Sequence, residues 1–194
     1  MKLIPTTLVI MSALLSTVSA QENALGQFDG HGDVGSPKLA GSARYDAASQ
    51  QYTLSRAGTN MWFRSDQFHF AWKKLKGDFI LRTRIEFVGK GAVAHRKVGW
   101  MVRPNLDADA PYADCAEHGD GLTSLQFRRT KGAITEQKES PVKGADVVQL
   151  ERKGGTYIMS VAKFGEPFTT TEVADVNLGD DVLVGLALCS HNPD

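Results

Sequence analysis

Apolar and polar residues alternate along much of this chain. In the segment 77–88, Phe79, Leu81 and Ile85 alternate with Arg82 and Arg84, which places apolar side chains on one face of a β-strand and polar ones on the other. The same alternation predicts further strands at 96–103, 121–129, 147–153 and 156–163. The segment 181–190 is nearly continuous in Val, Leu and Ala, as expected for a strand in the middle of a sheet.

Clusters of Gly, Pro, Asn and Asp separate these runs, and they are typical of turns. Gly154-Gly155 lies between two of the predicted strands and indicates a β-hairpin. The other clusters lie at 29–37, 58–60, 89–91, 105–114, 118–121, 144–146, 165–167 and 179–181. Many short strands, no long amphipathic helix and no internal repeat predict one all-β domain, an antiparallel β-sandwich or barrel.

The first twenty residues have the pattern of a secretory signal peptide. Lys2 precedes an uncharged stretch, residues 3–18, and Val18-Ser19-Ala20 provides small residues for cleavage before Gln21. A membrane anchor is the alternative, but the stretch is short and contains Pro, Ser and Thr. We therefore expect an exported protein, periplasmic or secreted, with a domain at 21–194 and no membrane span after cleavage.

The charge of the chain bears on its partners, and its two cysteines bear on disulfide formation. The chain has 22 basic and 22 acidic residues, whereas a protein that binds phosphate backbones needs a basic surplus, so no nucleic acid partner is expected. Cys115 lies in a polar, loop-like segment and Cys189 ends an apolar run. In an oxidising compartment they could form a disulfide, and a buried thiol at position 189 is an equally good interpretation.

Several motifs together resemble one family. The mature chain is similar to the N-terminal domain of bacterial TolB-family exported proteins, which resembles the concanavalin A-like lectin/glucanase jelly roll. The motifs that carry the resemblance are Gly58-Thr59-Asn60-Met61-Trp62, Asp66 to Lys74, Lys97 to Arg103, His118 to Gln126, Gln149 to Gly154 and Cys189-Ser190-His191-Asn192. The resemblance implies a concanavalin A-like antiparallel sandwich. Family members continue into a last strand and a β-propeller, whereas this sequence stops at Asp194, which predicts a truncated jelly roll.

Some segments resemble cofactor-binding motifs, either for a dinucleotide or for calcium. Residues 30–35 match G-x-G-x-x-G, but no strand-to-helix context surrounds them, so they are assigned to turns rather than to a dinucleotide site. Asn105, Asp107 and Asp109 alternate as in a calcium loop but lack the Gly and Glu of an EF-hand. Asp29, His31 and Asp33 also alternate. No cofactor is expected, with calcium as the alternative, since many jelly-roll lectins bind it.

Catalytic motifs of the common hydrolases are missing from the sequence. Glycosidases need two carboxyl groups across the scissile bond, and glucanases of this architecture place them on one strand as Glu-x-Asp-x-Glu. Here Glu86 and Glu151 are single acids on separate predicted strands, and no G-x-S-x-G motif is present. The sequence therefore favours a non-enzymatic role and leaves catalysis as an open alternative.

The candidate ligand-binding residues lie on the polar side of the predicted strands. Arg103, Gln126 and Arg128 point away from the apolar face, and His118 and Asp120 lie in the turn before the 121–129 strand. Jelly rolls bind ligands on an outward-facing concave sheet, where Arg, Gln and Asp can bond sugar hydroxyls. Trp62 or Trp72 could stack on a pyranose ring, whereas Trp100 is expected in the core because it shares a face with Val98 and Val102.

Three functions follow from this interpretation. The first is an exported binding module that recognises a glycan or another cell-envelope component. The second is a structural accessory domain that positions a TolB-like propeller for protein contacts. The third is a carbohydrate-active enzyme with an unusual site, in which His118, Asp120 and Arg103 act as acid, base and oxyanion-stabilising groups.

Overall fold

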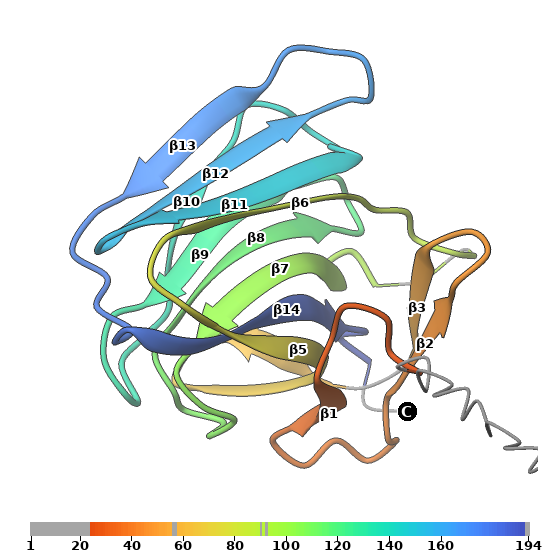
Figure 1. The fold of residues 1–194 in the computed structure, drawn as a ribbon, viewed down its shortest axis with the longest axis horizontal. Coiled ribbons are helices and arrows are strands. Elements are labelled where there is room, and N and C mark those ends of the chain that lie inside the picture. The colour runs from red at the N-terminus through yellow and green to blue at the C-terminus, as the bar shows by residue number, and fades with distance from the viewer. Residues whose placement is uncertain (1–23, 56–57, 90, 92, 193–194) are drawn as a thin grey trace, which may run out of the picture.

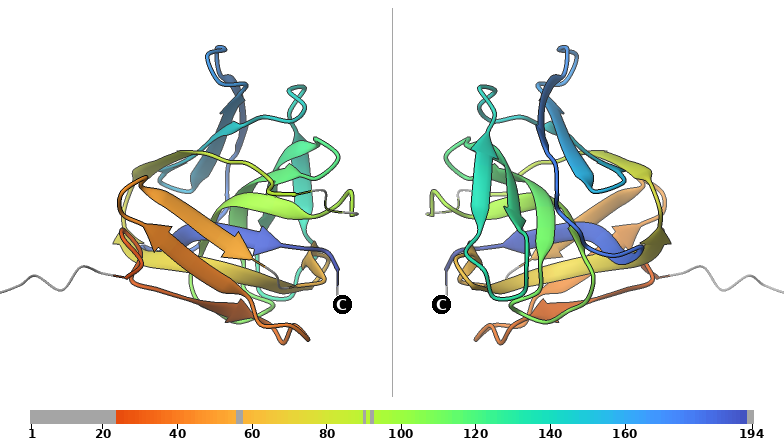
Figure 2. Two further views of the ribbon diagram at one scale, coloured as in Figure 1. Left: turned by 90° about the vertical axis from the view of Figure 1, so that its right-hand side faces the viewer. Right: turned by 90° about the vertical axis from the view of Figure 1, so that its left-hand side faces the viewer.

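The computed structural model describes residues 24–55, 58–89, 91 and 93–192. The predicted signal peptide, 1–20, lies outside this part of the chain. Within it the protein is all-β, with fourteen strands and no helix (Figures 1 and 2). Accordingly, no helix in the described ranges is long and apolar enough to cross a membrane.

Every strand pairing is antiparallel, and two sheets stack on each other. The large sheet has the order β1-β5-β14-β7-β8-β9-β10, with β4 also paired to β5. The small sheet has the order β13-β12-β11-β6, and β2 and β3 form a separate hairpin. The bounds of the strands are β1 Gly30–Val34, β2 Ser42–Asp46, β3 Gln51–Ser55, β4 Asn60–Trp62, β5 Ser65–Lys76, β6 Phe79–Arg84, β7 Lys97–Arg103, β8 Tyr112–His118, β9 Thr123–Arg128, β10 Glu136–Glu139, β11 Val147–Lys153, β12 Thr156–Ala162, β13 Thr169–Val173 and β14 Asp181–Cys189.

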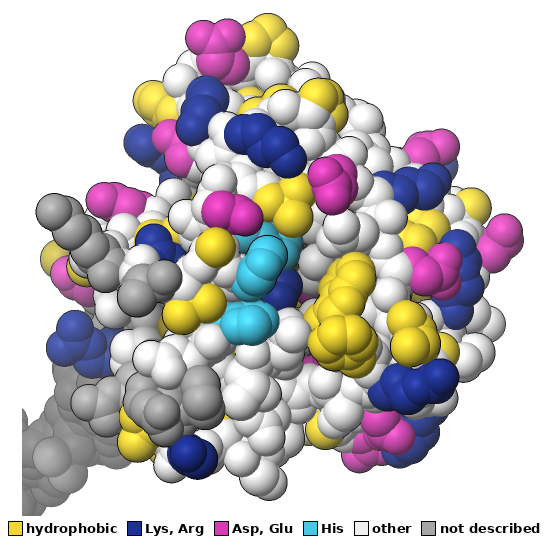
Figure 3. Space-filling model, turned by 180° about the vertical axis from the view of Figure 1, so that it is seen from behind, with side chains coloured by type: hydrophobic (Ala, Val, Ile, Leu, Met, Phe, Trp, Pro, Cys, Tyr) yellow, Lys and Arg dark blue, Asp and Glu magenta, His cyan; other side chains and the backbone are white. Residues whose placement is uncertain are grey.

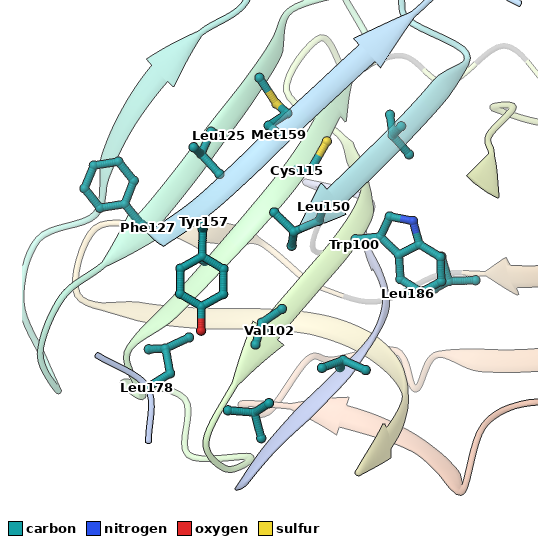
Figure 4. Packing of buried hydrophobic residues seen from close by; sticks show 14 of the residues in the cluster. Trp100, Val102, Cys115, Leu125, Phe127, Leu150, Tyr157, Met159, Leu178 and Leu186 are labelled. Carbon is teal, nitrogen blue, oxygen red and sulfur yellow. The ribbon is translucent and has the colours of Figure 1, made fainter. Parts of the chain in front are cut away.

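The main hydrophobic core lies between the two sheets. Leu125 and Trp100 from the large sheet pack toward Leu150 and Met159 from the small one (Figure 4). These side chains are at most 9% exposed. Burial of such apolar surface is the main contribution that holds stacked sheets together. The predicted sandwich and the predicted core position of Trp100 are confirmed.

Most of the predicted strands are present, with small shifts at their ends. The hairpin at Gly154-Gly155 is confirmed, because Lys153 and Thr156 are the paired residues that flank it. The central position of the last apolar run is confirmed as well, since β14 lies between β5 and β7. The assignment of 30–35 to turns was wrong for most of its length, because residues 30–34 form β1 and pair with β5.

Strand β8 was not predicted, because the turn cluster at 105–114 overlaps its beginning. All seven of its residues are buried, so both faces are covered and the polar-apolar alternation gives no signal. Cys115 therefore lies in a strand and not in a loop. Cys115 faces the main core, whereas Cys189 belongs to the cluster on the other face of the sheet, and both are free thiols. Burial raises the pKa of Cys189 to about 11, and it also raises the pKa of Cys115 well above the ordinary value.

Two glycines let strands of the large sheet come unusually close. A Cβ atom on Gly99 would lie 1.8 Å from the carbonyl oxygen of Cys115, and one on Gly185 would lie 1.8 Å from that of Ala71. Both contacts involve backbone atoms, which cannot move without disturbing the ladder. Glycine is therefore required at the centre of this sheet.

Substituting Gly99 by alanine is expected to lower the free energy of unfolding by about 1–3 kcal/mol, because the new methyl group overpacks the β7–β8 contact. Gly155→Ala is the matched control, since the nearest atom to its added Cβ would be 4.0 Å away. Urea unfolding of both variants measures the difference. Equal stability of the two would show that the sheet relaxes at Gly99.

Candidate ligand-binding site

The register of the large sheet brings polar residues together on its outer face, the one turned away from the small sheet. Lys97 on β7 pairs with His118 on β8, and Asp114 on β8 pairs with Gln126 on β9. Between these two pairs runs a row of small residues, namely Ala187, Gly99, Ala116 and Ser124. Long polar side chains thus stand on either side of a low strip. We call this group, Lys97, Asp114, His118, Ser124 and Gln126, the outer-face cluster.

Asp114 is the most unusual member of the cluster. It is 1% exposed, and neither of its carboxylate oxygens makes a hydrogen bond of normal geometry. Burial raises the pKa of its carboxyl group well above the ordinary value, while Lys97 and the backbone N–H of Gln126 act in the opposite direction. Burial therefore favours the protonated form of the Asp114 carboxyl group.

Two neighbours of Asp114 also have buried atoms without a partner, the hydroxyl of Ser124 and the Oε1 atom of Gln126. Of the seven buried side-chain polar atoms in the described ranges that make no hydrogen bond, four belong to these three residues. Buried polar groups in folded proteins are nearly always bonded. The unbonded polar atoms of the described residues are thus concentrated beneath one part of the outer face.

The histidine of the cluster is fixed in one tautomer. His118 Nδ1 donates to the carbonyl oxygen of Leu122 at 2.8 Å, so its Nε2 is an acceptor, and this atom lies 3.5 Å from the side-chain nitrogen of Gln126. Burial, together with the charge of Lys97, lowers the pKa of His118 to about 4. At neutral pH the imidazole is uncharged and presents a lone pair within the cluster.

Lys97 lies beside this imidazole and is itself buried. Its ammonium group donates to the side-chain oxygen of Asn60 on β4 at 2.9 Å, and the residue is 3% exposed. Burial lowers its pKa, and nearby Cys189 and Asp114 partly oppose that change. An ammonium with one bond to an amide keeps two further protons to donate.

Two more histidines surround the cluster at its open side. The ring of His95 lies 6.5 Å from that of His118 and 5.7 Å from that of His191, which follows β14. Figure 3 shows histidine side chains gathered around a basic side chain in a depression of this surface. His95 is exposed and His191 is half-buried. Both could contact a ligand that reaches the cluster from solvent.

Of the residues predicted from the sequence, the structure brings His118 and Gln126 into the cluster. Asp120 lies in the adjoining turn, where its carboxylate accepts a bond from the backbone N–H of Leu122. Trp62 is half-buried in β4, and Trp72 packs against Gly30 on β1. Phe63, which no sequence pattern singled out, is 61% exposed with a φ of 56°, a conformation unusual for a non-glycine residue.

Arg103 and Arg128 lie on the outer face as predicted, but they are 0% exposed. Arg128 forms two bonds with the carboxylate of Asp66, at 2.7 and 2.8 Å, and Arg103 lies 3.7 Å from the same group. Arg103 also donates to the carbonyl oxygens of Asn105 and Asp107. Burial lowers the pKa of Arg103 to about 10. These guanidinium groups have their partners inside the protein and offer no surface to a ligand.

Arg103 is also far from His118. It lies at the opposite end of β7 from Lys97, the residue that pairs with His118, and six residues of strand span roughly 20 Å. The acid-base trio of His118, Asp120 and Arg103 does not converge in this structure. An enzyme using those three groups together is therefore not supported by the fold.

The segments considered for calcium make other contacts. The carboxylates of Asp107 and Asp109 face the ammonium of Lys131 at 2.5 and 3.2 Å, and Asn105 accepts the backbone N–H of Asp107. Asp33 bonds to His69 at 2.7 Å, and His69 to His31 at 3.0 Å. In the part of the chain that the structure describes, no three His, Cys, Asp or Glu side chains are grouped to hold a metal ion.

Comparison with known proteins bears on the fold alone. No protein-family model and no curated protein matches this chain. A solved structure that does match is described as a functionally unknown protein from Saccharomyces cerevisiae, with a TM-score of 0.61 and 18% sequence identity. The match covers 84% of this chain and 88% of the yeast one. At this identity the likeness supports a common architecture and carries no information about a ligand.

Proposed function

We propose that this protein is an exported, non-catalytic binding module of the concanavalin A-like jelly-roll type, which holds a glycan on the outer face of its large sheet. The observation that carries the proposal is the set of buried, unbonded polar atoms on Asp114, Ser124 and Gln126. Leaving such groups without partners costs about 1–3 kcal/mol each. A ligand with several hydroxyl groups would recover that free energy if its binding displaced the side chains that cover these buried atoms.

Carbohydrate matches the chemistry of this surface. A sugar ring presents closely spaced hydroxyls, each of which donates and accepts, and the cluster contains a carboxyl group, a hydroxyl, an amide oxygen and an ammonium group. Phe63 has an exposed aromatic side chain, and its backbone carbonyl oxygen accepts from the buried Arg128, two residues along β9 from Gln126. Aromatic rings of this kind stack on the apolar face of a pyranose.

The sequence supports the remaining parts of the proposal. The expected signal peptide supports export, and the resemblance to the TolB-family N-terminal domain supports the jelly roll and a place in the cell envelope. A purely structural role beside a propeller would require no unbonded polar cluster on the outer face of the large sheet. For this reason we prefer ligand binding to the accessory role.

The test is glycan-array screening of the purified protein, followed by calorimetry on any glycan found. Gln126→Ala is expected to weaken binding at least tenfold, because it removes the amide that bonds His118 and Gln137 as well as the free oxygen. Gln51→Ala, on the exposed face of β3, is the matched control and should bind within twofold of the wild type. Thermal melting of each variant verifies folding. A folded wild type that binds no glycan, or unchanged binding by folded Gln126→Ala, would overturn the proposal.

A further inference from the structure

The charges around the outer-face cluster are unbalanced. Lys97, His95, His118 and His191 supply one ammonium and three imidazoles within a small area. The carboxyl group among them, Asp114, makes no hydrogen bond with any of these basic groups, and burial raises its pKa. Asp120 lies at the edge, in the turn beyond His118. The site therefore groups one ammonium with three imidazoles that can take up protons, and its buried carboxyl group is not hydrogen-bonded to any of them.

Lys97 and the neighbouring histidines repel one another electrostatically when the imidazoles are protonated. Burial is the main reason that the pKa values of His118 and His191 are lowered, and for both rings Lys97 and His95 lower them further. Protonation of either imidazole therefore adds a positive charge beside an ammonium that is already shielded from water. A bound anion would remove this repulsion and would favour the protonated rings.

We propose that the glycan held by the outer-face cluster is acidic, and that the carboxylate of a uronic acid residue binds among Lys97, His95, His118 and His191. This inference rests on the proposed function and adds the chemical class of the ligand. The carboxylate accepts from Lys97 Nζ, whose other bond goes to Asn60, and from the ring N–H groups of the histidines at the open side. Asp114, Ser124 and Gln126 remain for the sugar hydroxyls.

Binding of this kind is coupled to proton uptake. The groups that face His118 are Lys97 from β7, Asp120 from the following turn, His95 from the loop before β7, and Gln126 from β9. Of these, Lys97 and His95 oppose its protonation and Asp120 favours it. An anion beside Lys97 shifts the balance toward the imidazolium, so the bound state holds more protons than the free state. Affinity for an acidic glycan therefore increases as the pH falls from 7 to 5.

The experiment compares uronic acid oligosaccharides with their methyl esters, which keep the stereochemistry and remove the charge. Oligomers of galacturonate, glucuronate and mannuronate are titrated calorimetrically at pH 5.5 and 7. At least one acid is expected to bind ten times more tightly than its ester, with affinity higher at pH 5.5. Titration in buffers of different ionisation enthalpy should show net proton uptake. Inorganic sulfate is included to distinguish a glycan site from a simple anion site.

Substitutions in the site test which basic residues bind the carboxylate of the ligand. Lys97→Met should abolish the preference for acid over ester, and His191→Ala should reduce the proton uptake, whereas His31→Ala, a histidine on the edge strand β1, should change neither. Lys153→Met, an exposed lysine on β11, is the control for Lys97. Thermal melting again establishes that each variant is folded, and His191→Ala keeps the test valid if Lys97→Met does not fold.

The outcomes separate the two proposals. Tight binding of neutral glycans or esters, equal to that of the acids, would overturn the acidic specificity and leave the glycan-binding function standing. Sulfate binding as tightly as the oligomers would overturn the uronic acid assignment in favour of a simple anion. A folded protein that binds neither neutral nor acidic glycans would overturn both.

Discussion

Replacing Arg128 by alanine is expected to lower the free energy of unfolding by about 3–5 kcal/mol, the cost of breaking a buried ion pair from one side. The variant would leave the carboxylate of Asp66 at 1% exposure without its two strongest bonds. Arg128 also donates to the carbonyl oxygens of Phe63, Ala110 and Ala133. Three loops on the outer face would lose a common partner in a single substitution.

Chemical denaturation of a matched set measures this effect. Arg44→Ala removes an exposed arginine on β2 and should change stability by no more than about 0.5 kcal/mol. Asp66→Ala should be as destabilising as Arg128→Ala, because it leaves the guanidinium unpaired. The double variant should be more stable than the sum of the two predicts, by roughly 0.5–3 kcal/mol. Additive losses would show that the two residues act independently.

The second large effect is a pair of opposite pH dependences at neighbouring residues. Burial raises the pKa of Glu117 to about 7 from an ordinary 4.5, and its hydrogen bond with Thr123 opposes the change. Since the folded state prefers the protonated form, the wild type loses stability as the pH rises from about 4.5 to 7. His118 behaves in the opposite way, because its pKa falls from 6.5 to about 4 and stability is lost on acidification between those values.

Each of these two pKa changes corresponds to about 3 kcal/mol of unfolding free energy. The free energy of unfolding of Glu117→Gln should therefore rise by about 3 kcal/mol relative to that of the wild type between pH 4 and pH 8. That of His118→Gln should rise by the same amount relative to the wild type when the pH falls from 7 to 4. Urea unfolding at pH 4, 6 and 8 measures both differences. Glu136→Gln, on the exposed edge strand β10, serves as control. Parallel pH profiles for Glu117→Gln and the wild type would contradict the assignment for that residue.

Period-two patterning predicted those parts of the fold in which one face of a strand is buried and the other is wet. It succeeded for β11 and β12, where polar and apolar residues alternate around a Gly-Gly turn. It failed for β8, because Asp114 and His118 are buried on one face as completely as Ala113 and Cys115 are on the other. The polarity of a side chain can be read from the sequence, but its burial depends on which other parts of the chain pack over it.

The same limit explains the candidate site. Alternation correctly placed Gln126 and Arg128 on one face of the large sheet, but it could not show that Arg128 is fully buried and bonded to Asp66. Lys97 lies on that polar side of its strand, yet it gains significance only from the register that pairs it with His118. His95 and His191 come from loops about a hundred residues apart and are brought together by the ends of β7 and β14. Local sequence patterns do not predict contacts between residues so far apart in the chain.

The central place of β14 has a consequence for how the molecule is made. Its partners β5 and β7 were both synthesised well before it, yet they hydrogen-bond to it and not to each other. Because the chain emerges with its N-terminus first, the two halves of the large sheet must wait for residues 181–189 before they can join. Until then each half exposes a long unpaired edge, so nascent chains have a period in which they are open to aggregation or to binding by chaperones.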